Sequence, residues 1–319
     1  MTLPYYDAEA VEKLLDYPRC IAAMREAMAA LSAAGRAQPL RQIMALGQGR
    51  LFGVMPGELD ALGSFGAKLV SVFSDPSRPG RSRHRGVVAA FDGRSGELAC
   101  LADAETVTHI RTGCATAVAT DVLARTDATT LGIFGTGAQA DSHIRAIRHV
   151  RPLTDILLWG RSLTRATELA ERLSHELALP VRAVSDPREA AGAAILCTVS
   201  SSAEPVLLRE WVRPGTHVNL VGSSFLGPVE VDSALVQAAR YIVDYRPGVL
   251  AQASELAVAR EAGLVDDSHV VGEIGEVLLG RLPGRETADQ ITLYKSLGHV
   301  VQDLAAAARL HRRATEAAE

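Results

Sequence analysis

The sequence predicts an α/β protein with two domains, in which a parallel sheet flanked by helices is inserted into an α+β domain. A length of 319 residues suits two domains, at about 100–200 residues each. In the first third, short extended segments follow one another with only turns between them, as in an antiparallel sheet. From Thr130 onward, short apolar segments alternate with helical ones, as in a parallel sheet.

The first third begins with a helical pattern over 8–34 that Pro18 breaks into two pieces. Turn-rich segments then separate the strands that we predict. The predicted strands are Arg41–Leu46, Arg50–Val54, Gly66–Phe73 and Val87–Phe91.

A helix over Thr106–Arg125 is expected to link the two domains, and Ser162–Glu176 is a second helix. The tail, Ser296–Ala314, is helical and is expected to pack on the first domain. We therefore predict a substrate domain from 1–115 plus 296–319 and a second domain from 116–295. The strands predicted for the second domain are Thr130–Phe134, Asp155–Trp159, Ala194–Thr198, His217–Val221 and Tyr241–Val243.

Composition and charge exclude several classes of protein. With 48% hydrophobic and 22% charged residues and a net charge of −4, the chain suits neither nucleic acid nor an anionic membrane as its main partner. The first residues lack the pattern of a signal peptide, and the four cysteines are scattered, so we expect a cytoplasmic protein with reduced cysteines. The histidines form no metal-type cluster, and no metal is expected.

The segment after the first of these parallel strands carries the clearest functional pattern. Gly135-Thr136-Gly137-Ala138-Gln139-Ala140 has the Gly-x-Gly-x-x-Ala spacing and ends where a helical pattern begins. Gly135 permits a tight turn, Gly137 lets the backbone approach a phosphate, and Ala140 lets the helix pack closely on the strand. The inserted domain is therefore predicted to be a Rossmann dinucleotide-binding domain.

The residue after the next strand indicates which dinucleotide is bound. Coenzymes without a 2′-phosphate usually meet Asp or Glu at this point, whereas this chain has Arg161, followed by Ser162. Arg161 suits a 2′-phosphate, and Arg165 adds a second positive charge one helical turn later. The alternative is a solvated arginine at a helix start, but NADP(H) is favoured over NAD(H).

Three basic residues in or beside apolar segments predict a site for an anion. They are Arg41, Lys68 and Arg111, and long cationic side chains are rarely buried unless they are paired. Arginine suits a carboxylate, and a desolvated lysine has a pKa low enough for proton transfer. The alternative for each residue alone is a charge that extends to solvent.

Several separate motifs together resemble the ornithine cyclodeaminase/mu-crystallin family, nearly from end to end. They include Met55-Pro56-Gly57, Gly66-x-Lys68-Leu69-Val70-Ser71-Val72, Thr108-x-Ile110-Arg111-Thr112-x-Cys114-Ala115, the glycine turn, Pro214-Gly215-Thr216-His217-Val218-Asn219, Lys295-Ser296-x-Gly298 and Gln302-Asp303-Leu304-Ala305.

This resemblance implies a homodimer that dimerises by sheet packing, with a Rossmann domain inserted into the substrate domain. It also implies that Arg41, Lys68 and Arg111 hold the carboxylate of an amino or imino acid, with Lys68 as the catalytic group. We expect the dinucleotide site to comprise Thr112, Gly135, Gly137, Ala138, Gln139, Arg161, Ser162, Arg165, Thr198, Ser200, Val221, Gly222, Ser223 and Ser296.

One departure from the family pattern bears on the reaction. Ornithine-cyclising members carry an acidic residue where this chain has Ser224, and serine cannot act as a carboxylate base. The resemblance therefore favours NAD(P)H-dependent reduction of a cyclic imino acid, of the Δ1-pyrroline-2-carboxylate or Δ1-piperideine-2-carboxylate type, to the L-amino acid. The alternatives are an NAD(P)-dependent amino-acid dehydrogenase, an ornithine or lysine cyclodeaminase, and a non-catalytic protein that binds NADP(H) or a small ligand.

Overall fold

The chain forms two compact units in the computed structural model, which describes residues 3–73 and 84–316. Unit 1 consists of two segments of the chain, the first ending at Arg111 and the second beginning at His299. Unit 2 is the stretch between them, Thr112–Gly298. These limits lie a few residues from the domain limits predicted from the sequence. The stretch 74–83, part of a loop expected to help shape the substrate pocket, lies outside the described residues.

Unit 1 has two helices near its start, as predicted. They are α1 (Ala8–Leu14) and α2 (Tyr17–Ala33), and an aspartate caps each of them. Asp7 accepts from the N–H of Ala10 at 2.9 Å, and Asp16 accepts from the N–H of Arg19 at 3.0 Å. Pro18 occupies the first turn of α2, where its missing N–H costs no helical hydrogen bond, so the break falls just before it.

The described part of unit 1 holds a six-stranded sheet in the order β1-β6-β5-β4-β3-β2. Strands β2 to β6 pair antiparallel, as predicted, and β1 adds a parallel edge next to β6. The sequence did not predict β1 and β6, which are short and lack a clear alternation. The strands are β1 (Tyr5–Tyr6), β2 (Gln42–Ala45), β3 (Leu51–Leu59), β4 (Ser64–Val72), β5 (His84–Asp92) and β6 (Leu98–Asp103), with the turn η1 (Asp60–Leu62) after β3.

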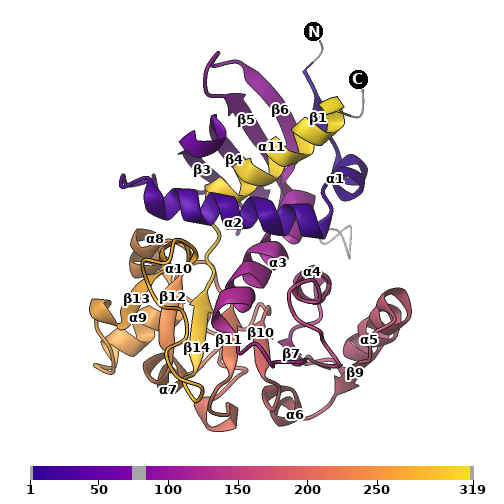
Figure 1. Ribbon diagram of the computed structural model, residues 1–319, viewed down its shortest axis with the longest axis vertical. Helices are drawn as coiled ribbons and strands as arrows, with labels where there is room; N and C mark the ends of the chain where they lie inside the picture. The colour runs from indigo at the N-terminus through magenta and orange to yellow at the C-terminus, as the bar shows by residue number, and fades with distance from the viewer. Residues whose placement is uncertain (1–2, 74–83, 317–319) are drawn as a thin grey trace. The chain divides into compact units, whose positions relative to one another are not determined.

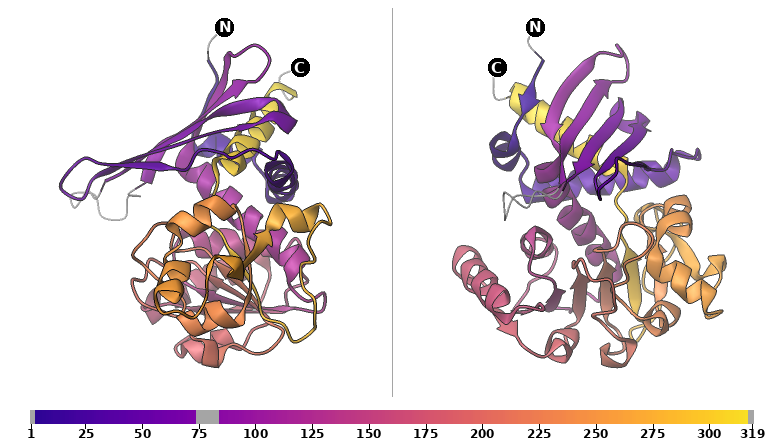
Figure 2. Two further views of the ribbon diagram at one scale, coloured as in Figure 1. Left: turned by 90° about the vertical axis from the view of Figure 1, so that its left-hand side faces the viewer. Right: turned by 180° about the vertical axis from the view of Figure 1, so that it is seen from behind.

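One face of this sheet is covered by helix α11 (Val300–Glu316), which packs beside α2 (Figures 1 and 2). The contact is close at two glycines. A Cβ on Gly57 would lie 2.4 Å from Val300, and one on Gly66 would lie 3.1 Å from Leu304. The prediction that the helical tail packs on the first domain is confirmed.

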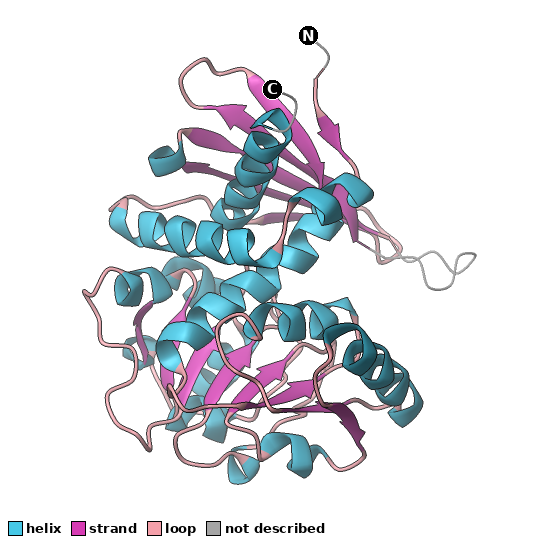
Figure 3. Ribbon diagram, turned by 45° about the vertical axis from the view of Figure 1, so that its right-hand side comes forward, coloured by secondary structure: helices cyan, strands magenta, loops and turns pink. Residues whose placement is uncertain are grey.

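Helix α3 (Ala104–Leu123) runs from unit 1 into unit 2, whose parallel sheet has the order β13-β12-β14-β11-β10-β7-β8-β9 with helices on both sides (Figure 3). This is a Rossmann-like arrangement. The strands are β7 (Thr130–Phe134), β8 (Asp155–Trp159), β9 (Val181–Val184), β10 (Ile195–Thr198), β11 (His217–Leu220), β12 (Arg240–Val243), β13 (Val270–Glu273) and β14 (Thr292–Lys295). The helices that follow α3 are α4 (Ala138–Ile147), α5 (Leu163–Leu177), α6 (Pro187–Ala191), α7 (Ser233–Ala238), α8 (Arg246–Gln252), α9 (Ser254–Glu261) and α10 (Ile274–Leu278), with short turns η2 (Arg209–Trp211) and η3 (Asp267–His269).

Strands β9, β13 and β14 were not predicted. Each is four residues long and carries a charged residue, so none reads as an apolar run. Strand β14 nevertheless lies between β11 and β12 and is fully buried. It forms because pairing with both neighbouring strands outweighs its weak local strand pattern.

All four cysteines are buried and free, in agreement with the reduced state expected from the sequence. In the part of the chain that the structure describes, no helix is both long and apolar enough to cross a bilayer. Within the same residues, no group of three or more His, Cys, Asp or Glu side chains is arranged to hold a metal ion.

Candidate functional site

The glycine turn after β7 has the geometry of a phosphate-binding loop. Gly135 has φ +141°, and a Cβ there would lie 2.7 Å from the carbonyl oxygen of Val199, so only glycine fits. Gly137 is the N-cap of α4 and makes no side-chain cap bond, and a Cβ there would meet nothing within 4 Å. Gly137 therefore leaves room beside the first turn of α4, as the close approach of a pyrophosphate to a helix N-terminus requires.

The first turn of α4 is fixed against α3 inside unit 2. A Cβ on Gly113 would lie 2.6 Å from Oγ of Ser142, so the two helices touch at this glycine. Nδ1 of the buried His143 lies 2.7 Å from the carbonyl oxygen of Gln139, and its Nε2 lies 3.0 Å from Oγ1 of Thr116. Burial lowers the pKa of His143 to about 4, so this neutral imidazole is a structural link beneath the loop.

The residues after β8, where the sequence predicts contact with a 2′-phosphate, lie at the surface. Ser162 caps α5 by accepting from the N–H of Arg165 at 3.4 Å. Arg161 and Arg165 are exposed. Over residues 3–73 and 84–316 neither guanidinium forms an ion pair, so both charges are available to a ligand.

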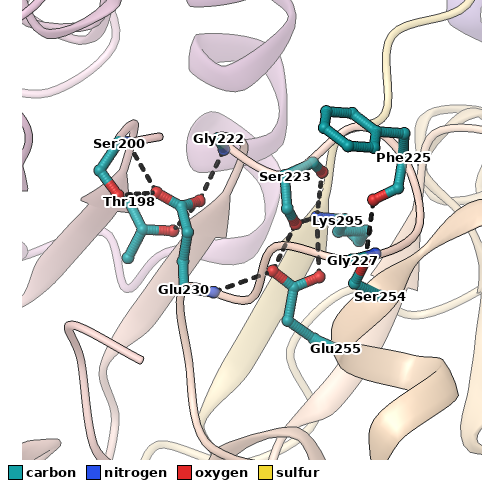
Figure 4. Close-up of polar contacts among 10 residues, drawn as sticks. All are labelled: Thr198, Ser200, Gly222, Ser223, Phe225, Gly227, Glu230, Ser254, Glu255 and Lys295. Atoms are coloured by element: carbon teal, nitrogen blue, oxygen red, sulfur yellow. Dashed lines mark hydrogen bonds and ion pairs between the residues drawn. The ribbon is translucent and has the colours of Figure 1, made fainter. Parts of the chain in front are cut away.

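The ends of β10 and β11 are held together by a buried carboxylate that sequence reasoning missed (Figure 4). One oxygen of Glu230 accepts from the N–H and hydroxyl of Ser200, at 2.6 and 2.8 Å. The other accepts from the hydroxyl of Thr198 and the N–H of Gly222, at 2.9 and 2.6 Å. Burial raises the pKa of Glu230, and its hydrogen bonds oppose that shift. The hydroxyl of Thr198 therefore uses its proton inside unit 2, and its predicted contact with the dinucleotide stays a prediction.

The remaining residues predicted for the dinucleotide site are mostly buried. Val221 and Ser296 follow β11 and β14, and the N–H of Ser296 donates to the carbonyl oxygen of Leu220 at 3.0 Å. Ser223 is buried and bonded within unit 2, and Thr112 is buried in the middle of α3. The structure thus places Val221, Ser223 and Ser296 at or near strand ends and Thr112 in a helix, and the contact of all four with a dinucleotide stays a prediction.

Two of the three predicted basic residues of unit 1 meet on one carboxylate. Nζ of Lys68, from β4, lies 3.2 Å from Oδ1 of Asp303 on α11. Nε of Arg111 donates to the same oxygen at 3.0 Å, and its Nη1 donates to Oε1 of Gln302 at 2.6 Å. Lys68 also donates to Oγ1 of Thr108 at 3.3 Å. All of these charged groups are buried.

Burial is the main influence on the ionisation of this cluster. It lowers the pKa of Lys68 to about 8, while Asp303 raises that pKa and the charges of Arg111 and Arg41 lower it further. Burial alone would raise the pKa of Asp303, but Arg111 and Lys68 bring it below its usual value. Asp303 is therefore ionised at neutral pH, and Lys68 can exchange a proton near neutrality.

His299 lies one helical turn before Asp303 and is also buried. Its Nδ1 accepts from the N–H of Val301 at 3.3 Å, so the proton of the neutral ring is on Nε2. Burial lowers its pKa to about 4. Arg41, which is half-buried just before β2, contributes its charge to the same region, since it affects both Lys68 and His299.

Asp303 and His299 were not predicted as site residues, although a signal for Asp303 was present. The tail helix has an apolar face that includes Val300, Leu304 and Ala307, and Asp303 lies on that face. Asp303, a carboxylate among apolar residues, needs a cationic partner, and Lys68, a cation in an apolar strand, needs an anion. These two requirements together would have suggested that Asp303 pairs with Lys68.

Comparison with known proteins matches both units. Residues 5–318 match the model of the ornithine cyclodeaminase/mu-crystallin family. The chain is 32% identical to a Δ1-pyrroline-2-carboxylate reductase of Bacillus cereus over 264 residues, covering 82% of this chain and 81% of the relative. It is 32% identical to the mouse ketimine reductase mu-crystallin over 275 residues, covering 86% and 84%.

A solved structure agrees with these relatives. It is the Δ1-pyrroline-2-carboxylate reductase of Thermococcus litoralis in complex with NADH and L-proline, with a TM-score of 0.94 and 29% identity, covering 99% of this chain and 98% of that one. The match to the family model extends over nearly the whole sequence, and both reductases exceed 30% identity. The chain therefore belongs to the ornithine cyclodeaminase/mu-crystallin family.

Proposed function

We propose that this protein is an oxidoreductase that reduces a cyclic imino acid, of the Δ1-pyrroline-2-carboxylate or Δ1-piperideine-2-carboxylate type, to the L-amino acid with NADPH. The observation that carries the proposal is the single carboxylate of Asp303, which two buried cations, Lys68 and Arg111, share in unit 1. The named relatives that reduce such imines add support.

The charge of this cluster favours an anionic substrate. Protonated Lys68, Arg111 and the nearby Arg41 are positive, whereas Asp303 is negative and His299 is neutral. A buried cluster with excess positive charge gains from a further anion. The carboxylate of an imino acid supplies that anion, and Arg111 and Arg41 are the groups that we assign to hold it.

Lys68 is the group that we assign to proton transfer. When bound, the dinucleotide supplies the hydride that adds to the imine carbon. The imine nitrogen must then gain or keep one proton to become the amine, and a lysine with a pKa of about 8 is protonated at neutral pH and can release that proton. Solvent afterwards restores the proton on Lys68.

The preference for NADPH rests on the positive surface after β8. Arg161 and Arg165 are exposed one helical turn apart, and the cap residue Ser162 lies between them. A 2′-phosphate would receive charge-assisted hydrogen bonds from both guanidinium groups. The open α4 N-terminus and the glycine turn fit the pyrophosphate of either dinucleotide.

We also propose that unit 1 forms a homodimer through the face of its sheet that α11 leaves uncovered. Phe65 and Phe91 pair on that face with ring centroids 5.1 Å apart, and Met44 and Phe52 pair on the same face further along the strands. Met44 is 61% exposed and Phe65 is 39% exposed. A large apolar sheet face is typical of a protein interface. Phe65→Glu should convert a dimer into a monomer in sedimentation velocity, and a dimer that survives this change would overturn the assignment.

The reaction is tested by following NADPH and NADH oxidation with a panel of cyclic imino acids and linear 2-oxo acids, with and without ammonia. Oxidation with the cyclic imino acids alone supports the proposal. Oxidation that requires a linear 2-oxo acid and ammonia supports an amino-acid dehydrogenase instead. Binding of NADPH without turnover of any compound would indicate the non-catalytic alternative. Ammonia release from ornithine or lysine would contradict the argument from Ser224.

A further inference from the structure

The segment 222–227, which follows β11, is held at Gly222, Ser223, Phe225 and Gly227 by buried side chains of unit 2 (Figure 4). At its start, the N–H of Gly222 donates to Glu230 at 2.6 Å. A Cβ on Gly222 would lie 2.1 Å from the carbonyl oxygen of Ser200, so no larger residue fits. At its end, Oγ of Ser254 accepts from the N–H of Gly227 at 2.7 Å and donates to the carbonyl oxygen of Phe225 at 2.8 Å.

The centre of the segment is held by a buried ion pair. Nζ of Lys295, at the end of β14, donates to both the carbonyl oxygen and the hydroxyl of Ser223, at 2.7 Å each. The same nitrogen lies 3.1 Å from Oε2 of Glu255 on α9, and both side chains are fully buried. The hydroxyl of Ser223 donates in turn to Glu255, so one serine bridges the two charges.

The two buried carboxylates of this region belong to one network. The N–H of Glu230 donates to Oε1 of Glu255 at 3.2 Å, so Glu255 fixes the backbone position of Glu230. The side chain of Glu230 in turn joins the ends of β10 and β11. Lys295 thus acts on the segment directly through Ser223 and indirectly through Glu255. An ion pair of this kind stabilises a fold little more than apolar residues of the same size, so its value lies in fixing one geometry.

The strand order indicates what that geometry serves. Parallel strands end at the same edge of a sheet, and the order is β14-β11-β10-β7-β8. The pyrophosphate site follows β7 and Arg161 follows β8, so the adenosine half lies on the β8 side. The nicotinamide half then extends over the ends of β10 and β11, where segment 222–227 begins.

We propose that Lys295 and Glu255 are positioning residues for the nicotinamide half of the dinucleotide. They hold Ser223 and the backbone of 222–227 in place, and neither needs to touch the ligand. The inference rests on the proposed function, because it requires a dinucleotide on unit 2. It goes beyond that function by assigning a role to two residues that carry no part of the hydride or proton transfer.

The test measures binding of two probes by calorimetry to the full chain without substrate. NADPH spans both halves of the site, whereas adenosine 2′,5′-bisphosphate occupies only the adenosine half. In Lys295→Met and Glu255→Gln, affinity for NADPH should fall about tenfold, equivalent to about 1.4 kcal/mol, because displaced binding groups lose their contacts. Affinity for the bisphosphate should stay within about twofold.

Arg151→Met is the matched control. Arg151 is also a buried cation of unit 2, paired with Asp121 at 3.1 Å, but it precedes β8 and so lies at the opposite edge of the sheet. Replacing it should lower Tm, but any change in affinity should be the same for NADPH and for the bisphosphate. The double variant Lys295→Met/Glu255→Gln should regain part of the Tm lost in Lys295→Met, because it leaves no lone buried carboxylate, but it should not regain NADPH affinity.

If the Lys295 and Glu255 variants lose affinity for NADPH and for the bisphosphate to the same extent, as a general loss of stability would cause, the positioning role is overturned. Unchanged affinity for NADPH would overturn it as well. If Lys295→Met does not fold, Glu255→Gln decides the question, because it keeps the shape of the side chain. A wild-type chain that binds neither probe contradicts the proposed function itself, whereas a wild-type chain that binds both leaves that function standing whatever the variants do.

Discussion

Nζ of Lys68 lies 3.2 Å from Oδ1 of Asp303, although the two residues are 235 positions apart in the chain. The strand lysine of unit 1 thus takes its counter-ion from the last described helix, and Arg111 shares it. Burial lowers the pKa of Lys68, which makes its proton easier to release, whereas Asp303 raises that pKa and keeps the lysine protonated near neutral pH. Lys68 therefore has both the charge and the acidity that a proton donor needs.

Replacing Lys68 with Met should lower kcat for imine reduction by about a hundredfold or more, the usual contribution of a positioned acid. Affinity for NADPH should stay within about twofold, because the residues that we assign to the dinucleotide lie in unit 2. Steady-state kinetics and calorimetry measure the two effects. Lys13→Met, an exposed lysine at the end of α1, is the control and should leave both unchanged. Near-normal turnover in the Lys68 variant would remove Lys68 from the mechanism.

The rate of reduction should decline as the pH rises through about 8. Burial lowers the pKa of Lys68 to about 8, and only the protonated form can donate, so activity is lost above that pH and retained below it. Asp303 raises this pKa, so in Asp303→Asn the decline should begin at a lower pH than in the wild type. The kcat–pH profile measures both effects.

Asp127→Asn provides the comparison for that profile, since Asp127 forms an exposed ion pair with Arg125 in unit 2. Its profile should match that of the wild type. A decline at the same pH in Asp303→Asn and the wild type would show that the group that titrates is not Lys68.

Replacing Arg161 with Ala should weaken NADPH binding by roughly 10- to 100-fold, the range expected for one charged hydrogen bond worth about 1.5–3 kcal/mol. NADH has no 2′-phosphate, so its dissociation constant should change by less than about twofold. Arg182→Ala on β9 serves as the control, because that arginine is also exposed but pairs with Asp155. Equal weakening of NADPH and NADH binding would contradict the assignment of Arg161 to the 2′-phosphate.

Two glycines of the same turn should respond differently to alanine. Gly135→Ala places a Cβ 2.7 Å from a backbone oxygen at φ +141°, so Tm should fall clearly. Gly137→Ala meets no atom within 4 Å and has φ −92°, which alanine adopts easily, so its Tm should stay near that of the wild type. Dinucleotide affinity should nevertheless fall in Gly137→Ala, because its methyl group occupies the approach to the phosphates. Unchanged affinity would place the pyrophosphate elsewhere.

Features governed by local constraints could be predicted from the sequence. The bounds of β7 and β8 match the prediction, because each strand is an apolar run that ends at a turn residue. The glycine turn could be predicted for the same reason, since a positive φ and a close backbone approach both require glycine. The antiparallel sheet was recognisable from extended segments that follow one another with only turns between them.

Features that depend on contacts between residues far apart in the sequence could not be predicted. Nothing in the sequence pairs Glu255 with Lys295, and only the fold brings them together around Ser223. Glu230 could not be recognised either, because nothing local in the sequence connects it to β10. For Lys68 the sequence suggested a ligand anion, and the structure adds an internal one, Asp303, which shares the site with it.

The discontinuity of unit 1 has a consequence for synthesis. Because Asp303 lies in α11, Lys68 and Arg111 remain without this counter-ion until all of Thr112–Gly298 has left the ribosome. Burying either cation without a partner costs several kcal/mol, so the sheet that emerges first from the ribosome cannot close over its own lysine. The strands of unit 1 are made first, but the charged cluster of Lys68, Arg111 and Asp303 is completed last, after unit 2 has had time to fold.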